Sequence, residues 1–347
     1  MRPIGEAKAI QVLVTNRCWY DCANCSELTG HMHPSKKFNM PLSNVEAALQ
    51  TLVDYPGHVG IFGGEPTLHP QFGEVLALLR KYVWVKARRE LWTSGAMWKK
   101  WKTDIEETFY PELISFNDHS KPEECFHQPN NIAARDVFNG EVTGNAGQDA
   151  QLMWKCINNC WIQNRWSPII NPLGAFFCET AGARALVMGG PAGIPVTEGW
   201  WRRPLSDWNY QIGVLCSRCS ACLPMPMRAN SYQGFDNISP TTQEMFAAAR
   251  SPKHQKGHTK LADLDSIRQF YKGHSFTPNP NYLMRGSFVD FPDWTPWKYR
   301  PVTKNVPDGT ERPIAQVVEE QRQLGSDRCV DGTERPVEDV VKDQKGQ

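Results

Sequence analysis

The chain has 347 residues, 40% of them hydrophobic, so it is long enough to bury one large core together with a smaller domain. Its 38 lysine and arginine residues nearly balance its 37 aspartate and glutamate residues, which excludes a general electrostatic attraction to nucleic acid. No apolar run approaches the roughly 20 residues of a membrane span, and no signal-peptide stretch opens the sequence, so we expect a cytoplasmic protein without a membrane partner.

The first third of the sequence alternates short apolar runs with longer helical patterns, which is typical of βα units and a parallel sheet. Strands are predicted at residues 9–14, 58–62, 90–93 and 113–116, and helices at residues 43–53 and 71–82. Ser43 and Glu46 have the spacing of a capping box at the start of the first helix. Since ligands bind at the carboxyl ends of parallel strands, the loops after these four strands are the predicted site.

Cys18, Cys22 and Cys25 form a Cys-x3-Cys-x2-Cys loop after the first predicted strand, and Gly-Gly-Glu-Pro at residues 63–66 follows the second. Three thiolates on so short a loop can hold three corners of a four-iron four-sulfur cluster and leave the fourth iron open. A zinc site, the alternative, takes four ligands, usually as two close pairs. The two glycines allow backbone groups to approach a ligand closely, and Glu65 can accept a charge-assisted hydrogen bond from an ammonium group.

These motifs resemble the radical S-adenosylmethionine (radical SAM) superfamily. The resemblance implies an α/β fold with a partial (βα) barrel, a 4Fe-4S cluster, S-adenosylmethionine, and an electron donor such as flavodoxin or ferredoxin. In that family the Gly-Gly-Glu-Pro segment binds the methionine amino group. Electron transfer from the reduced cluster splits the sulfonium and releases a 5′-deoxyadenosyl radical, which abstracts a substrate hydrogen, while the protein positions and shields that radical.

The resemblance also assigns roles by position. Ser94 matches a strand-end motif near the cofactor's ribose and carboxylate, and Ser115 and Asn117 match the next strand-end motif. The implied cofactor-binding residues are Asn24, Gly63, Gly64, Glu65, Pro66, Ser94, Ser115 and Asn117. No catalytic residue is nominated by the sequence.

One position departs from the family pattern. The residue before the third cysteine is usually aromatic and packs at the adenine, whereas here it is Asn24. Trp19 and Tyr20 are the alternatives for the adenine contact.

Residues 119–155 should contain the remaining barrel strands, but the sequence predicts only a helix near residues 131–138 and a Gly/Asn-rich loop at residues 139–147. Residues 167–177 then predict a hairpin that carries Cys178 on its second strand.

A second cysteine set resembles the auxiliary-cluster domain called SPASM, or twitch when it is shortened to one cluster. It comprises Cys160, Gly174 and Cys178, followed by Cys216, Cys219 and Cys222. The resemblance implies one auxiliary 4Fe-4S cluster in a small α+β domain, with Cys219 and Cys222 completing its ligands, Cys216 as the alternate and Cys156 as another substitute. Such a cluster would serve as an electron conduit. A structural zinc held by the thiolates of Cys160, Cys178, Cys219 and Cys222 is the alternative. The implied metal ligands of both sites are Cys18, Cys22, Cys25, Cys160, Cys178, Cys216, Cys219 and Cys222.

Two segments mix aromatic and basic residues. Residues 98–102 (Trp-Lys-Lys-Trp-Lys) have side chains that can stack on RNA bases, but a solvated helix face explains them better, and nucleic acid is not an expected partner. Residues 200–203 (Trp-Trp-Arg-Arg) fit either an anionic or sugar-like ligand or a loop whose tryptophans pack inward.

The expected domains are a radical SAM partial barrel at residues 1–155, a twitch/SPASM-like domain at 156–235, a C-terminal extension at 236–299, and a charged tail at 300–347. The tail is poor in large apolar residues, which is typical of a flexible, disordered segment.

The leading functional hypothesis is a radical SAM oxidoreductase, or an enzyme of related radical chemistry, that abstracts hydrogen from a small polar molecule such as a sugar or aminocyclitol. The first predicted strand begins at residue 9, which leaves no room there for a peptide-recognition domain and favours a small substrate. The first alternative is a maturase of a ribosomally made peptide. The second is a zinc-stabilised binding protein without catalysis.

Overall fold

The computed structural model describes residues 1–116, 126–160, 162, 168–223, 228–229 and 234–273. The described chain is a mixed α/β structure around a six-stranded sheet with the strand order β4-β3-β2-β1-β6-β7. The strands of this sheet are β1 (Ala9–Thr15), β2 (His58–Gly63), β3 (Arg89–Thr93), β4 (Ile114–Phe116), β6 (Ile169–Asn171) and β7 (Gly174–Phe176). All neighbouring pairs are parallel except β6 and β7. The four predicted strands of the first third are therefore confirmed.

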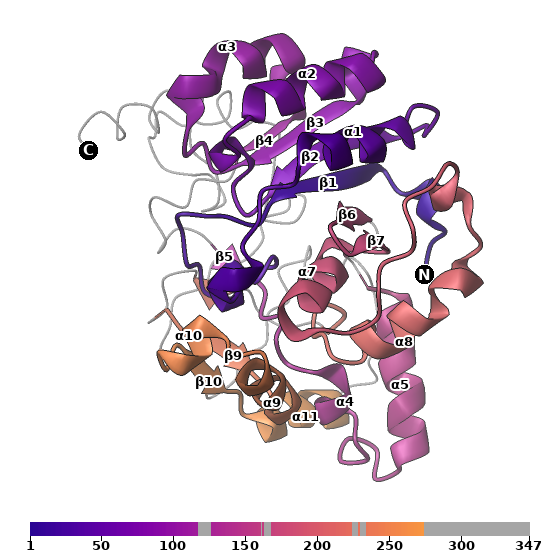
Figure 1. The fold of residues 1–347 in the computed structure, drawn as a ribbon. Helices are drawn as coiled ribbons and strands as arrows, with labels where there is room; N and C mark the ends of the chain where they lie inside the picture. The colour runs from indigo at the N-terminus through magenta and orange to yellow at the C-terminus, as the bar shows by residue number, and fades with distance from the viewer. Residues whose placement is uncertain (117–125, 161, 163–167, 224–227, 230–233, 274–347) are drawn as a thin grey trace, which may run out of the picture.

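Three helices lie side by side on one face of the sheet, which Figure 1 shows above β1 to β4. They are α1 (Leu42–Gln50), α2 (Phe72–Tyr82) and α3 (Trp98–Thr108). Their apolar faces are buried, and every residue of β1 is buried because helices and loops cover both sides of the sheet. α7 (Glu179–Met188) packs against β6 and β7.

The capping box predicted at Ser43 is wrong. α1 begins one residue earlier, at Leu42, and its N-cap is Pro41, which makes no side-chain capping bond. The Pro41 carbonyl instead accepts the amides of Asn44 and Val45 at 2.9 and 3.0 Å, so that Ser43 lies inside the first turn. Val45, Ala48 and Leu49 of this helix are buried.

The remaining barrel strands expected at residues 119–155 do not join the main sheet in the described part of that range. β5 (Phe126–His127) pairs with β8 (Arg228–Ala229) in a separate antiparallel sheet, and two helices follow, α4 (Ala134–Val137) and α5 (Ala146–Asn158). The main sheet grows at its other edge, where β6 pairs with β1. The segment that takes this edge, Ile169–Asn171, is buried along its whole length.

The predicted hairpin is confirmed as β6 and β7, but the position given to Cys178 is wrong. Cys178 lies beyond β7 as the N-cap of α7, where its sulfur accepts the amide hydrogen of Ala181 at 3.4 Å.

The C-terminal described segment forms a second layer of small elements. They are β9 (Asp236–Ile238), α9 (Pro240–Ala248), α10 (Pro252–Gln255), β10 (Thr259–Leu261) and α11 (Leu264–Gly273), whereas α8 (Asn209–Cys216) packs against α7. β9 and β10 pair in parallel, and α10 lies against the short 3-10 helix η2 (Thr29–His31). Leu28 and Met32 share a small apolar core with Ile238 and Phe246, so this segment packs against the chain that follows the first cysteine loop. The predicted tail at residues 300–347 lies outside the described residues.

In the part of the chain that the structure describes, no helix has the length and apolar character needed to cross a membrane.

Candidate functional site

The first cysteine loop and the Gly-Gly-Glu-Pro segment meet at the carboxyl end of the sheet. The loop follows β1, and the segment follows β2, which lies beside β1. The Gly64 amide donates to the Thr15 carbonyl at 2.9 Å, and the Glu65 amide donates to the Arg17 carbonyl at 2.8 Å. The Gly-Gly-Glu-Pro segment is therefore bonded to the end of β1 and to the residue just before Cys18, where the cysteine loop begins.

The two glycines are required by this contact. A Cβ atom on Gly63 would lie 2.8 Å from the Thr15 carbonyl oxygen, and one on Gly64 would lie 2.7 Å from the Arg17 carbonyl oxygen. Any other residue would push the two loops apart. The structure thus gives the two glycines a role in a close approach between two segments of this chain, whereas the sequence analysis expected them to allow the approach of a ligand.

Glu65 is 1% exposed, and its carboxylate ties two strand ends together. One oxygen accepts the Thr67 amide, the Thr67 hydroxyl and the Thr93 hydroxyl at 3.0, 2.5 and 2.7 Å. The other accepts the amide and hydroxyl of Ser94 at 2.7 and 2.6 Å. Glu65, predicted to accept a bond from a ligand ammonium, already accepts these five bonds from the chain, and Ser94 is one of its donors.

Asn24 has a structural reason to replace an aromatic residue. Its φ of 55° lies in the left-handed region, which asparagine tolerates better than bulky residues do. Its amide donates to an oxygen of Asp236 at 2.5 Å, and its side-chain oxygen accepts the Asn237 amide at 3.1 Å. Asn24 is 2% exposed, whereas Trp19, one of the two alternatives for the adenine contact, is 61% exposed beside Cys18.

The three loop cysteines form no disulfide and are partly exposed. The Cys18 sulfur accepts the Tyr20 amide hydrogen at 3.4 Å, and the Cys25 sulfur lies 3.8 Å from the Thr29 hydroxyl. Burial raises the pKa of the Cys18 thiol to about 12, and the nearby charges of Glu65 and Cys25 add to this rise, against the Lys37 ammonium. A cationic metal would reverse this preference and favour the thiolate.

The second cysteine set lines a cavity that is partly open to solvent and spans about 420 Å³ when the open solvent at its mouth is included. Among the described residues, it is lined by the five thiols of Cys160, Cys178, Cys216, Cys219 and Cys222, and its remaining wall is mostly apolar. Cys156 is fully buried in a neighbouring apolar core and is not among the lining residues. Burial raises the pKa of the Cys178, Cys216 and Cys222 thiols well above the usual value.

Arg184 places a guanidinium at this cavity, and sequence reasoning missed it. The side chain is 1% exposed, and its described hydrogen bonds run to neutral groups: the Asn130 carbonyl, the Asn131 side-chain oxygen at 3.1 Å and the Met188 sulfur. Its Nε has no partner in the described structure. A buried cation with only neutral partners costs several kcal/mol, which an anionic occupant of the cavity would offset. The sequence feature that could have indicated Arg184 is its place as the one charged residue in a stretch of small and apolar residues, 181–187.

Both donor sets fit iron-sulfur clusters in their chemistry. The first offers three thiols on one loop, and the second offers five thiols together with a guanidinium that favours an anionic group. Within the described ranges, no group of three or more His, Cys, Asp or Glu side chains is placed to hold a single metal ion.

Other predicted positions lie apart from these sites or outside the description. Ser115 is half-buried in β4, and Asn117 lies outside the described residues. Trp98 is buried in α3. Trp200 and Trp201 are buried against Thr51, with indole N–H distances of 3.1 Å to its hydroxyl and 3.2 Å to its carbonyl, so the inward-packed loop is the alternative that the structure supports.

No protein-family model matches the sequence, and the comparison with curated proteins gave no match. Among solved structures, the chain is similar to BtrN in complex with AdoMet and 2-DOIA, with 17% identity, a TM-score of 0.40, and coverage of 61% of this chain and 92% of that one. It is also similar to BtrN in an open conformation, with the same identity and coverage and a TM-score of 0.34. Because these scores are low, we argue function from this chain's own residues.

Proposed function

We propose that this chain is a radical SAM enzyme. The observation that carries the proposal is that the Gly-Gly-Glu-Pro segment bonds to Thr15 and Arg17, the backbone that leads directly into the Cys-x3-Cys-x2-Cys loop, at the carboxyl ends of β1 and β2. Cys18, Cys22 and Cys25 would hold three irons of a 4Fe-4S cluster. When bound, that cluster and S-adenosylmethionine would supply reductive cleavage of the sulfonium and hydrogen abstraction from a substrate.

The chain's own contribution is a fixed frame around this chemistry. Glu65 joins the ends of β2 and β3, so the Gly-Gly-Glu-Pro backbone and Ser94 keep one arrangement relative to the cysteine loop. Such a fixed edge can orient a zwitterionic ligand without reorganising when it binds. Trp19 offers an exposed indole for a stacking contact with adenine.

We extend the proposal to one auxiliary 4Fe-4S cluster that conducts electrons, held by Cys160, Cys178, Cys219 and Cys222, with Cys216 as the alternate ligand. The Arg184 guanidinium, whose described hydrogen bonds run only to neutral groups and whose Nε has no partner in the described structure, supports an anionic cluster in that cavity. A short path supports the electron route: Glu179, next to Cys178, hydrogen bonds with Ser26, which follows Cys25.

The substrate we propose is a small polar molecule such as a sugar or aminocyclitol. Gln11 brings a polar side chain into the buried interior beside Glu179, and its side-chain oxygen has no partner in the described structure. Buried polar groups of this kind are satisfied by hydroxyl or amino groups of a ligand more readily than by apolar ones. An electron donor such as flavodoxin or ferredoxin belongs to the same proposal.

Anaerobic reconstitution followed by metal and sulfide analysis tests the proposal. Two clusters predict about eight irons and eight sulfides per chain. Zinc bound without sulfide would overturn the proposal in favour of a zinc-stabilised binding protein. Transfer of deuterium from labelled sugars or aminocyclitols into 5′-deoxyadenosine then tests the substrate class.

A further inference from the structure

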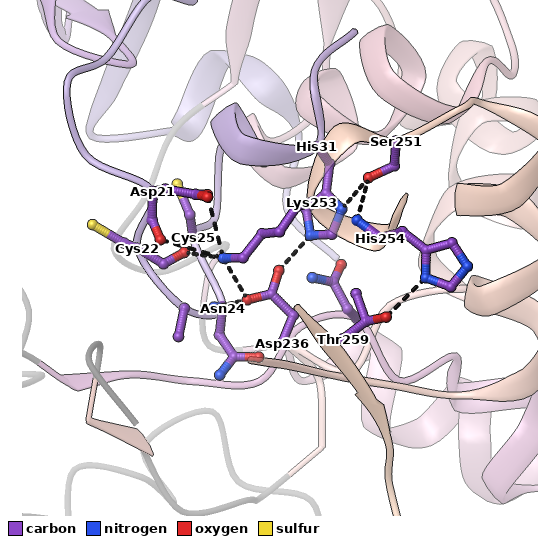
Figure 2. A network of polar contacts seen from close by, with 12 residues as sticks. Asp21, Cys22, Asn24, Cys25, His31, Asp236, Ser251, Lys253, His254 and Thr259 are labelled. Carbon is purple, nitrogen blue, oxygen red and sulfur yellow. Dashed lines mark hydrogen bonds and ion pairs between the residues drawn. The ribbon is translucent and has the colours of Figure 1, made fainter. Parts of the chain in front are cut away.

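A buried ion pair lies beneath the first cysteine loop and comes from the C-terminal described segment, more than 200 residues along the chain (Figure 2). Lys253 Nζ lies 3.0 Å from one oxygen of Asp236, and both side chains are 1% exposed. Taking two charges out of water costs several kcal/mol each unless further hydrogen bonds satisfy them. The other bonds of this pair therefore show what it does.

The Lys253 ammonium donates to the cysteine loop itself. It bonds to the main-chain carbonyl of Cys22 at 2.8 Å and to that of Asp21 at 3.4 Å. It also lies 3.5 Å from the half-exposed Asp21 carboxylate. One buried cation is thus bonded to the backbone of a proposed cluster ligand.

The Asp236 carboxylate holds the next turn of the same loop. One oxygen accepts the Asn24 amide at 2.5 Å, and the other is bonded to His31 Nε2. His31 is fixed in turn by Ser251, with 2.7 Å between Nδ1 and the hydroxyl, and by stacking on Phe246. Figure 2 shows the side chains of this network converging between the loop and the C-terminal segment.

The loop depends on these bonds because it has little structure of its own. Residues 16–27 form no helix or strand, and Asn24, between Cys22 and Cys25, has a left-handed backbone. The ion pair bonds to the carbonyls of two loop residues and the amide of a third. It therefore fixes the stretch that sets how Cys22 and Cys25 are presented.

We propose that Asp236 and Lys253 are positioning residues for the group bound by Cys18, Cys22 and Cys25: they preform the loop and set the charge beside it. This inference rests on the proposed function. An ammonium near an anionic cluster favours the reduced state, and a carboxylate disfavours it. The two residues therefore have the same effect on loop order and opposite effects on the reduction potential.

Hydrogen–deuterium exchange of the full-length chain without metal tests the preformed loop. Lys253→Met and the isosteric Asp236→Asn should both speed exchange of residues 21–25, while far-UV circular dichroism stays that of the wild type. Lys36→Met is the matched control, because Lys36 also donates to two main-chain carbonyls, of Leu186 and Val187, away from the loop. Exchange of residues 21–25 unchanged in Asp236→Asn would overturn the positioning role, whether or not Lys253→Met folds.

The reduction potential of the reconstituted first cluster tests the charge effect. To isolate that cluster, the measurement uses chains that also carry Cys178→Ala. Lys253→Met should shift the potential to more negative values, Asp236→Asn to less negative values, and Lys36→Met should leave it unchanged. Shifts of the same sign, or none, would overturn the electrostatic role. A wild-type chain that binds no cluster would contradict the proposed function instead, and the exchange experiment would still decide on the loop.

Discussion

The Glu65 carboxylate, in the turn after β2, accepts hydrogen bonds from two segments: the η4 helix (Pro66–Leu68) that follows it and the end of β3. A carboxylate only accepts hydrogen bonds, and all the groups facing it donate. This complementarity makes the position intolerant of even an isosteric amide.

Glu65→Gln should lower the free energy of unfolding of the metal-free chain by about 1 to 3 kcal/mol, because the amide NH₂ would face donors and leave buried groups unsatisfied. Urea unfolding measures this loss. Glu141→Gln is the control, since Glu141 is exposed in a loop and should change little. Equal stabilities for the two variants would mean that the Glu65 network does not hold the strand ends.

The cavity cysteines give a second prediction at the residue scale. Cys178→Ala should remove about four irons per reconstituted chain, whereas Cys156→Ala should retain them all, because Cys156 is buried outside the cavity. Iron and sulfide analysis measures both. A full iron count in Cys178→Ala would show that this cysteine is not a ligand.

Helix starts show where local sequence patterns succeed and fail at the scale of elements. α1 has a capping-box sequence but no capping bond, whereas Asn145 caps α5 and accepts the amides of Gly147 and Gln148 at 2.9 and 3.0 Å. A residue suited to capping forms its side-chain bond only where the helix begins directly after it.

We therefore expect Ser43→Ala to change the free energy of unfolding by less than about 0.5 kcal/mol, and Asn145→Ala to lower it by about 1 kcal/mol. Denaturant unfolding of both variants under one set of conditions measures the difference. A larger loss for Ser43→Ala than for Asn145→Ala would contradict the observed helix starts.

The sequence predicted those elements whose signal is local. The apolar run of β1 and the periodic face of α2 are enough to place a strand and a helix, and the two motifs at their ends indicated the first site. The pairing of β6 with β1 was not predictable in this way, because the local pattern of the hairpin does not indicate which strand of the sheet it joins. Cys178 was misplaced for a similar reason, since the hairpin ends two residues before it.

At the scale of the whole molecule, the contact between Asn24 and Asp236 joins residues 212 positions apart. Neither residue carries a pattern that points to the other, so no single-sequence argument finds the pair. Arg184 and the five-thiol cavity are of the same kind, because only the folded chain brings α7, α8 and the turn after α8 together. The contacts of charged and polar side chains between distant segments were thus the part of the site that the sequence could not predict.

The buried carboxylate of Asp236 predicts how the stability of the whole chain depends on pH. Burial by itself raises the pKa of Asp236, but Lys253 and His31 outweigh it and lower the pKa from 3.8 to about 2. Because the pKa of Asp236 is lower in the folded chain than in the unfolded one, its ionised carboxylate stabilises the fold by about 2 kcal/mol above pH 3.8. This stabilisation is lost as the pH falls from 3.8 toward 2. The stability gap between wild type and Asp236→Asn should therefore shrink between about pH 4 and pH 2. Urea unfolding across this range measures the gap, and one that stays constant would contradict the ion pair.

The most direct test of the account is the electron paramagnetic resonance spectrum of the reduced, anaerobically purified chain before and after addition of S-adenosylmethionine. We predict that the signal of the first cluster changes on addition, because an iron without a protein ligand can bind the amino and carboxylate groups of the nucleotide. Cys22→Ala should show no such change. A wild-type signal that S-adenosylmethionine leaves unaltered would contradict the central claim.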